Sequence, residues 1–317
     1  MNTEKSEYIP GRISVVMPCY NAEAHLADSI ESVLAQSHPD VELIVVDDGS
    51  TDNSQSILES FSDRITHLSQ KNKGPGPARN IGIAQATGEY VAFLDADDYW
   101  DQDCLQELFQ ALAGTDAALS YCGWQNVGGP ANRSQPYIPP NYETFDKAER
   151  FLQTAAPWPI HAALVRHDIL KAVGCFDEQW PTCMDYDLWL KIGTSAPIIL
   201  VEKVLAYYRH HGSTQITSNQ WRQARNVLSV KKHFIKLHPE RVTHLDKQAL
   251  RNLTYGAYLN RGFDAYWKRD LISAHHIFRH CLAERYFQAK QLKYLLLALL
   301  PQKLFIKLVG GLEGKQG

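Results

Sequence analysis

The stretch Tyr90-Val91-Ala92-Phe93-Leu94-Asp95-Ala96-Asp97-Asp98 joins an apolar run to three carboxylates. The run has the composition of a buried strand, and the acidic residues follow at its carboxyl end. Ligands of open α/β sheets bind at the carboxyl ends of the strands. Carboxylates placed there suit Mg²⁺ or Mn²⁺ carrying a diphosphate, because these cations prefer hard oxygen ligands. A helix N-cap or a solvated acidic turn would show the same short pattern, so the rest of the chain must decide between these interpretations.

Strand-like and helix-like segments alternate on either side of this stretch. Repeated strand–helix units predict an α/β fold whose central sheet is mostly parallel and is covered by helices on both faces. Asn21 is expected to cap the helix that follows it. A long loop is predicted over 123–142, a pair of strands around 198–208, and a helical region after residue 221. The remaining predicted elements are strands at 13–17, 41–46, 64–68 and 90–94, a short helix that follows the turn at 48–52 and ends near Phe61, and helices at 77–86, 102–113 and 185–193.

The composition is that of a globular protein without a membrane span. The chain has 317 residues, of which 44% are hydrophobic and 21% are charged, so it can bury a large core. No apolar run approaches the roughly 20 residues that cross a bilayer, and the polar start lacks the apolar core of a signal peptide. The six cysteines match no zinc spacing and are typical of reduced thiols in a cytosolic protein.

Charge is distributed unevenly along the chain. Residues 1–220 hold 14 Lys and Arg against 29 Asp and Glu, whereas residues 221–317 hold 18 against 6. A strongly basic final third indicates an anionic partner or an anionic membrane face, and packing on the acidic part of the chain is the alternative. The leucine run at 294–300 fits either an interfacial or a buried helix. Nucleic-acid binding is not expected, because the basic residues lack interleaved stacking motifs.

Three further polar segments accompany the acidic one. Residues 17–21 (MPCYN) and 45–50 (VVDDGS) end the first two predicted strands, and residues 72–80 (NKGPGPARN) open a predicted helix. Segments that follow parallel strands can line one edge of a sheet, where together they can build a nucleotide site. Four side chains have suitable chemistry: Tyr20 for stacking on a base, Asp48 for a base imide, Arg79 for a phosphate and Asp97 for a metal.

As a set, the segments VVMPCYN, VDDGSTD, NKGPGPARN and FLDADD closely resemble family 2 glycosyltransferases of the GT-A fold. The resemblance covers about residues 12–215. It implies a nucleoside-diphosphate-sugar donor, most often UDP-linked, and inversion at the anomeric carbon. Asp95 and Asp97 would form the D-x-D motif for a divalent metal, with Asp97 the direct ligand, while Asp47 is interpreted as a brace for its loop. The nucleotide-sugar contacts implied are Pro18, Tyr20, Asn21, Asp48, Gly74, Arg79, Asp95, Ala96 and Asp97.

A second signature of the same family lies further along the chain. Residues 183–191 (CMDYDLWLK) look like its acceptor-side E-D-x-D-L-W-L-R pattern. By this resemblance Asp185 is the general base, which would take the proton from the acceptor hydroxyl. Met184 stands where the family usually has an acidic residue. The loss of this neighbouring charge bears on how the pKa of the base is set or on which acceptor is chosen. Asp187 is interpreted as a structural carboxylate at a helix start.

The segment Tyr208-Arg209-His210-His211-Gly212 resembles the Y-R-x-H segment of the family. It implies that His211 is a metal or diphosphate ligand, with an ordinary surface or core histidine as the alternative. Trp158, His161 and Trp180 flank the acceptor side, where aromatic rings can stack on a sugar, although core packing is the default for each.

The predicted protein is therefore a metal-dependent, inverting glycosyltransferase. We expect a GT-A domain at 1–220, with a nucleotide-sugar half at 12–115 and an acceptor half at 116–220, followed by a basic helical region at 221–317. The acceptor would be a glycan or glycolipid of surface polysaccharide assembly, and the place of action the cytoplasm, at the inner face of the cell membrane. A nucleotidyltransferase also fits the acidic site but leaves the Asp185 segment unexplained. A non-catalytic nucleotide-sugar-binding protein is the third alternative, with slight support from Met184.

Overall fold

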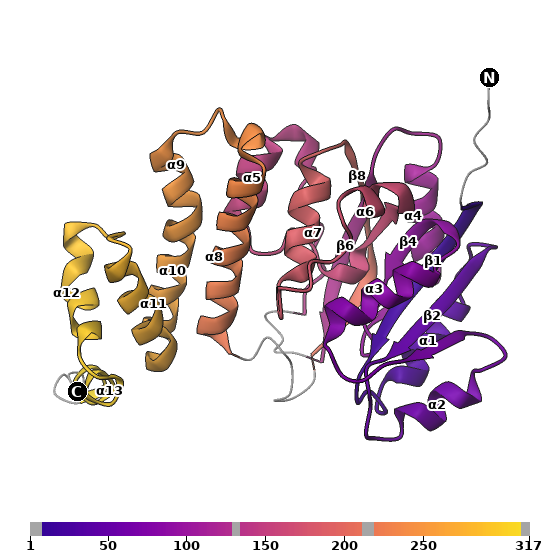
Figure 1. Cartoon of the computed structure of the whole chain (residues 1–317), viewed down its shortest axis with the longest axis horizontal. Coiled ribbons are helices and arrows are strands. Elements are labelled where there is room, and N and C mark those ends of the chain that lie inside the picture. The colour runs from indigo at the N-terminus through magenta and orange to yellow at the C-terminus, as the bar shows by residue number, and fades with distance from the viewer. Residues whose placement is uncertain (1–7, 129–133, 211–218, 312–317) are drawn as a thin grey trace. The chain divides into compact units, whose positions relative to one another are not determined.

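The computed structural model describes residues 8–128, 134–210 and 219–311, and Figure 1 labels its elements. The chain forms two compact units. The first, called the sheet unit, comprises Met1–Arg150 and Ala156–Ser213. The second, called the helical unit, comprises Phe151–Ala155 and Thr214–Gly317. Within the described ranges, no helix is both long enough and apolar enough to cross a membrane.

In its described part, the sheet unit contains one eight-stranded sheet in the order β3-β2-β1-β4-β7-β6-β8-β5. The first four strands in this order are parallel to one another. Beyond them the sheet is mixed, because β7 is antiparallel to both β4 and β6, while β8 is parallel to β6. The predicted α/β class is confirmed. The strands are β1 (Ile9–Cys19), β2 (Val41–Asp47), β3 (Thr66–Ser69), β4 (Gly88–Phe93), β5 (Tyr99–Trp100), β6 (Leu119–Val127), β7 (Ala163–Arg166) and β8 (Ile198–Arg209).

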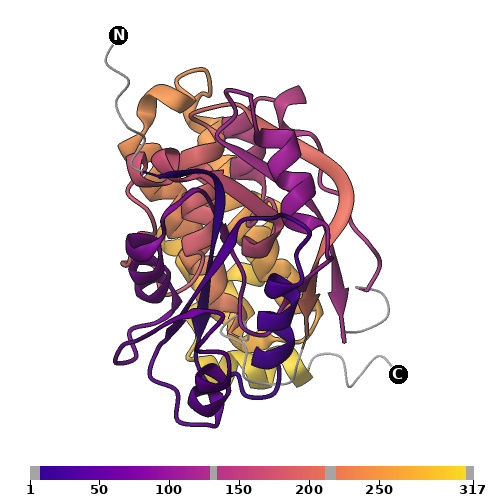
Figure 2. The same cartoon turned by 90° about the vertical axis from the view of Figure 1, so that its right-hand side faces the viewer.

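Helices cover both faces of the parallel half, as the indigo and purple segments of Figure 2 show. Consecutive residues of β1, including Val15, Val16 and Met17, are fully buried, which is typical of parallel strands packed on both sides. Helix α3 packs closely on β1 at Gly82, where an added Cβ atom would lie 2.4 Å from Val16 Cγ1. The helices of this unit are α1 (Leu26–Leu34), α2 (Ser54–Ser60), α3 (Pro75–Gln85), α4 (Cys104–Leu112), α6 (His167–Ala172) and α7 (Met184–Gly193), with short 3₁₀ turns at η2 (Tyr142–Thr144) and η3 (Ile160–Ala162).

Three local predictions are wrong. The expected pair of strands around 198–208 is the single strand β8, which is long because it pairs with both β6 and β5. The expected loop over 123–142 begins with a strand, because β6 continues to Val127 and Gly123 marks a shift in register rather than a strand end. Asn21 does not cap the next helix, since α1 begins at Leu26 after the N-cap residue His25.

The helical unit is a bundle with its own core. Tyr258, Phe278 and Phe305 are among the buried side chains that fill it. One buried residue is a lysine: Lys231, 1% exposed, donates from Nζ to Leu152 O at 2.6 Å and to Leu253 O at 3.1 Å. Burial lowers the pKa of Lys231 to about 7. The elements are α8 (Gln220–Leu237), η5 (Pro239–Val242), α9 (Lys247–Arg251), the π-helical segment η6 (Asn252–Gly256), α10 (Ala257–Trp267), α11 (Leu271–Ala283), η7 (Ala289–Gln291), α12 (Leu292–Leu295), η8 (Leu296–Leu299) and α13 (Gln302–Gly311), while α5 (Lys147–Gln153) carries the chain into this unit from the other.

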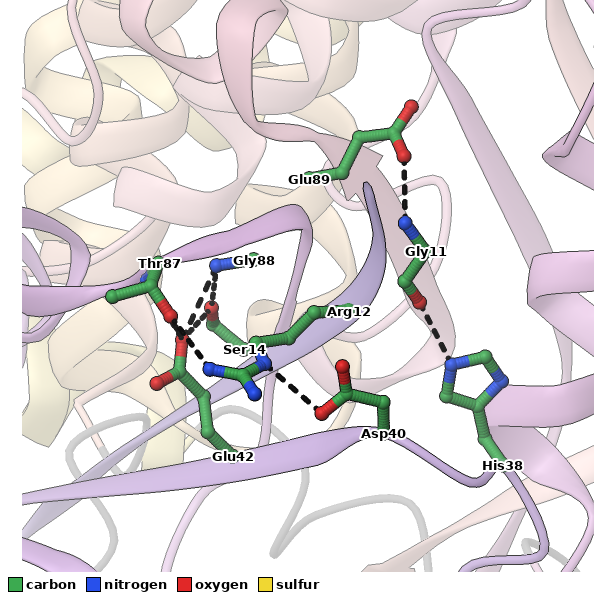
Figure 3. Close-up of polar contacts among 9 residues, drawn as sticks. All are labelled: Gly11, Arg12, Ser14, His38, Asp40, Glu42, Thr87, Gly88 and Glu89. Atoms are coloured by element: carbon green, nitrogen blue, oxygen red, sulfur yellow. Dashed lines mark hydrogen bonds and ion pairs between the residues drawn. The ribbon is translucent and has the colours of Figure 1, made fainter. Parts of the chain in front are cut away.

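A polar cluster joins β1, β2 and β4 near their amino ends (Figure 3). Its centre is the carboxylate of Glu42, whose Oε1 accepts hydrogen bonds from Thr87 N at 2.7 Å, Thr87 Oγ1 at 2.8 Å and Gly88 N at 3.2 Å, and also from Ser14 Oγ. Nearby, Arg12 pairs with Asp40 at 2.9 Å on a more exposed surface. The sheet is thus tied together at the end opposite to the carboxyl ends of its parallel strands.

Replacing Glu42 with alanine is expected to lower the free energy of unfolding by about 2–3 kcal/mol. The change leaves two backbone N–H groups and two hydroxyls without the charged acceptor that they share. Asp40→Ala is the control, and we expect a loss below about 1 kcal/mol because its ion pair is exposed. Chemical denaturation of both variants measures the difference, and equal losses would show that Glu42 does not organise this edge.

Candidate functional site

The polar segments singled out in the sequence meet at the carboxyl edge of the parallel strands. Strands β2, β1 and β4 are neighbours in the sheet. Their ends are joined by hydrogen bonds from Asp48 N to Cys19 O at 2.8 Å and from Leu94 N to Val16 O at 3.2 Å. The segments that continue from these three strands therefore lie side by side.

Asp48 organises the loop that leads into α3. It is 3% exposed, and its Oδ1 accepts from Gln70 Nε2 at 2.7 Å and from Lys73 N at 2.8 Å. Its Oδ2 accepts from Gly74 N at 2.8 Å. Gly74 has a φ of +95°, a conformation that favours glycine, and is the N-cap residue of α3. Asp47 braces the neighbouring turn through Ser50 N at 3.0 Å, in agreement with its interpretation from the sequence.

The segment after β1 offers an exposed ring on a fixed backbone. Tyr20 is 51% exposed, so its ring is accessible for stacking, and Pro18 is half-buried. Asn21 has a φ of +50°, and its Oδ1 accepts from Thr51 N at 2.7 Å. This side chain therefore joins the segment after β1 to the turn after β2.

The acidic residues after β4 converge. Oxygen atoms of Asp95, Asp97 and Asp98 all lie within 4.8 Å of one another. A tight turn brings them together, because Asp98 N donates to Asp95 O at 3.0 Å. Three carboxylates at this separation repel one another and fit a hard divalent cation such as Mg²⁺ or Mn²⁺. Ala96 is buried, and its carbonyl accepts a hydrogen bond from Ser29 Oγ at 3.0 Å. This bond joins the acidic turn to helix α1.

Arg79 supplies positive charge beside this cluster. It projects from α3, is 4% exposed and forms an ion pair with Asp95. Its guanidinium also lies over the ring of Phe176, 5.4 Å from the centroid. Its Nε has no hydrogen-bond partner in the described part of the chain. A buried guanidinium with an unused donor next to an acidic site is suited to an anionic ligand.

Asp98 and His161 form a buried pair that the sequence analysis did not identify. His161 Nδ1 lies 3.0 Å from Asp98 Oδ2, and Arg209 N donates to Asp98 Oδ1 at 2.8 Å. Burial raises the pKa of Asp98 to about 6. Burial alone would lower the pKa of His161, but the Asp98 carboxylate outweighs it and the pKa is raised. The pair holds the end of β8 next to the acidic turn. His161 is fully buried, which agrees with core packing rather than with stacking on a sugar.

Asp185 belongs to the same electrostatic environment. It is the second residue of α7 and is half-buried. Burial raises the pKa of its carboxyl, the positive charge of Arg79 opposes this shift, and the negative charge of Asp95 adds to it. These interactions link the residue expected on the acceptor side to the residues expected on the donor side. A raised pKa in a polar site is typical of a carboxylate that exchanges protons.

Among the other residues singled out near α7, Asp187, Trp158 and Trp189 are buried. Asp187 is buried and pairs with Lys191 at 2.6 Å, which agrees with its interpretation as a helix-start carboxylate. Trp158 and Trp189 are fully buried, with ring centroids 5.6 Å apart. Trp180 is half-buried. His211 lies outside the described residues, so its predicted role as a ligand stays a prediction.

Comparison with known proteins gives one family and one fold. The family model for glycosyl transferase family 2 matches residues 14–174. The chain is 31% identical over 251 residues to the putative teichuronic acid biosynthesis glycosyltransferase TuaG of Bacillus subtilis, which covers 76% of this chain and 95% of TuaG. Against the first three curated relatives that it matches, the chain spans only 66%, 36% and 36% of their length.

Two solved structures share the fold at low sequence identity. S. aureus TarS in complex with UDP aligns with a TM-score of 0.61 at 19% identity, over 94% of this chain and 90% of that one. The mannosyltransferase PcManGT from Pyrobaculum calidifontis, in complex with GDP-Man and Mn²⁺, aligns with a TM-score of 0.56 at 18% identity, over 97% and 88%. These similarities confirm the predicted GT-A-type architecture.

Proposed function

Because the chain belongs to glycosyl transferase family 2, we propose that it transfers a sugar from a UDP-linked donor to an acceptor hydroxyl with inversion at the anomeric carbon. The observation that carries the proposal is the acidic turn of Asp95 and Asp97 with Arg79 paired to it. The charges of Arg79 and Asp95 also act on the pKa of Asp185. The proposed acceptor is a glycan or glycolipid of cell-surface polysaccharide synthesis. The similarity of this chain to TuaG, a putative teichuronic acid biosynthesis glycosyltransferase, supports this class of acceptor.

The donor half of the proposed site binds the nucleotide and its diphosphate. Tyr20 stacks on the base, and Asp48 and Asn21 hold the loops around it. Asp95 and Asp97 would hold a divalent cation, which would supply positive charge to the diphosphate leaving group. Arg79 would stabilise the same developing charge through its guanidinium, which lies beside Asp95. The solved PcManGT complex with a nucleotide sugar and Mn²⁺ supports a metal of this kind.

Asp185 acts as the general base in a single displacement. The acceptor oxygen attacks the anomeric carbon and gives its proton to the Asp185 carboxylate. The bond between that carbon and the diphosphate oxygen breaks, and the nucleoside diphosphate leaves with the electron pair. One base is sufficient, since an inverting transfer needs no covalent intermediate with the enzyme. The raised pKa of Asp185 makes it a better proton acceptor than an exposed aspartate.

Release of UDP from a panel of UDP-sugars tests this function. Each donor is incubated with the protein in Mn²⁺, without added metal, and with EDTA. Metal-dependent release from one donor would support the proposal and identify the sugar. If UDP does not bind at all, the nucleotide assignment is wrong.

We also propose that the protein acts at an anionic membrane surface, through α12, η8 and α13. Leu296, Leu299, Leu304 and Leu308 are between 42% and 60% exposed, although the opposite side of these helices packs into the helical-unit core. The sequence from residue 285 to residue 311 contains five Lys and Arg but no Asp or Glu. Exposed leucines among lysines are typical of helices that lie in a membrane interface. The cytoplasmic face of the cell membrane would supply the anionic lipids.

Full-length protein is expected to bind vesicles of phosphatidylglycerol and phosphatidylcholine at low salt. The double substitution Leu299→Gln and Leu304→Gln should weaken this binding about tenfold, because it removes apolar surface that would enter the interface. Ile272→Gln is the control, since Ile272 is 50% exposed but lies on α11. Vesicle co-sedimentation provides the measurement. Absence of binding by the unmodified protein, or an equal loss in the control, would refute the membrane proposal.

A further inference from the structure

A polar groove of about 570 Å³ lies within the helical unit, and none of the proposed donor-site or acceptor-site residues lines it. It is bounded by the end of α9, the π-helical segment η6, the start of α10 and the turn after α11. Two arginines, Arg251 and Arg285, line it together with the rings of Tyr286 and Phe287. Six amide side chains complete the polar lining: Gln153, Gln248, Asn252, Asn260, Gln288 and Gln291.

The composition of this groove suits an acidic sugar chain. Amide groups donate and accept hydrogen bonds, as the hydroxyls of a sugar require, and aromatic rings offer flat apolar surfaces. No Asp or Glu lines the groove in the described part of the chain. Arginine is the side chain best shaped to bind carboxylate or phosphate oxygens in pairs.

Arg251 is held in place before any ligand arrives. Its guanidinium lies over the rings of Tyr255 and Tyr286, 5.6 and 5.7 Å from their centroids. Its Nη2 donates to Glu284 O at 3.2 Å and to Arg285 O at 3.4 Å, which leaves the N–H groups of Nε and Nη1 for a ligand. The Glu284 carboxylate is occupied elsewhere, because it accepts from Tyr255 OH at 2.7 Å. A guanidinium positioned in this way loses little freedom on binding.

The backbone around the groove is also unusual. Arg285 has a φ of +51°, a conformation that non-glycine residues rarely adopt, and its side chain is exposed. The segment η6 is a π-helix, a rare form that is frequently found at functional sites. Asn252 at its start accepts hydrogen bonds from Tyr286 OH at 2.9 Å and Gln248 Nε2 at 3.0 Å, which joins three of the segments that line the groove.

We infer that this groove binds a segment of a glycan that carries carboxylate or phosphate groups. The inference deepens the proposed function and rests on it, because the acidic glycan would be the acceptor or its product. Such a site would hold several sugar units of the glycan.

Isothermal titration calorimetry with defined probes tests the inference. We expect the full-length protein to bind hexagalacturonate or phosphorylated maltohexaose at least tenfold more tightly than neutral maltohexaose. Arg285→Asn removes the charge but keeps a residue that tolerates positive φ, and it should weaken binding of the acidic oligosaccharide about tenfold. Arg269→Asn is a matched control, because Arg269 is exposed, has a φ of +66° and lies outside the groove.

Three outcomes of these measurements would contradict the inference. Equal losses in the two variants would show that the groove is not the site. Binding of tripolyphosphate as tightly as the acidic oligosaccharides would show that only charge is recognised. If Arg285→Asn weakens binding to anionic vesicles and leaves oligosaccharide binding unchanged, the groove contacts lipid instead. UDP binding is measured on the same samples, so that failure of the proposed donor site is seen separately from failure of the groove.

Discussion

Asp185→Asn is expected to lower kcat by about 10²–10⁴-fold and to leave UDP binding nearly unchanged. Asparagine keeps the size and polarity of the side chain, but it cannot accept the proton of the acceptor hydroxyl. Burial raises the pKa of Asp185. Because the base must be deprotonated, the activity of the unmodified enzyme should be lost as the pH falls through this raised pKa, at a higher pH than if the base were an exposed aspartate. Steady-state rates over a pH series, with UDP binding by calorimetry, provide the measurement.

Asp187→Asn is the control for this substitution. Asp187 lies on the same first turn of α7, but it is buried in an ion pair with Lys191. Its loss should lower the melting temperature and leave kcat close to that of the unmodified enzyme. If Asp185→Asn retains full transfer activity, then Asp185 is not the base. If no transfer is found in any variant while UDP still binds, the chain is a nucleotide-sugar-binding protein rather than an enzyme.

The second large effect is expected for Asp97→Ala, which should lower transfer by about 10²–10³-fold and abolish the effect of Mn²⁺ on UDP binding. Asp97 is one of the three carboxylates whose oxygens lie within 4.8 Å of one another. Removal of one leaves a weaker site for a divalent cation and less compensation for charge on the diphosphate. Electron paramagnetic resonance of Mn²⁺, titrated with protein and UDP, measures the metal directly.

Asp103→Ala controls for a general loss of negative charge. Asp103 is an exposed residue that precedes α4, six positions along the chain from Asp97. The Asp103→Ala variant should bind Mn²⁺ and UDP with the same affinity as the unmodified protein. Equal Mn²⁺ affinity in Asp97→Ala and in the unmodified protein would remove Asp97 from the metal site.

Local patterns were enough to predict the parallel half of the sheet and the acidic turn at its edge. An apolar run such as 90–94 that stands between two predicted helices is best explained as a buried strand. The residues that follow the end of a parallel strand must then lie at the carboxyl edge of the sheet. By contrast, the Asp98–His161 pair joins residues 63 positions apart, through strands that the sequence could not order. The ion pair of Arg79 with Asp95 depends in the same way on how α3 packs on β1.

The helical unit was predictable only in outline. Its helical content and basic charge are evident in composition, but the groove depends on side chains between positions 153 and 291 that no periodicity relates. The predicted strand pair at 198–208 failed for a similar reason, since pairing partners rather than propensity determine where β8 ends. Packing between distant segments is the information that the single sequence does not provide.

The assignment of Phe151–Ala155 to the helical unit has a consequence for how this chain can be divided. The two units are interleaved, because the chain enters the helical unit, returns to the sheet unit at Ala156 and leaves it again at Thr214. A single crossover in the gene cannot exchange one unit for another without separating Leu152 from Lys231, which hydrogen bonds to it. A protein fragment cut near residue 214 would likewise keep Phe151 and Leu152 but lose the bundle to which they belong. Recombination and fragment design must therefore keep the two units together in one continuous segment of the gene.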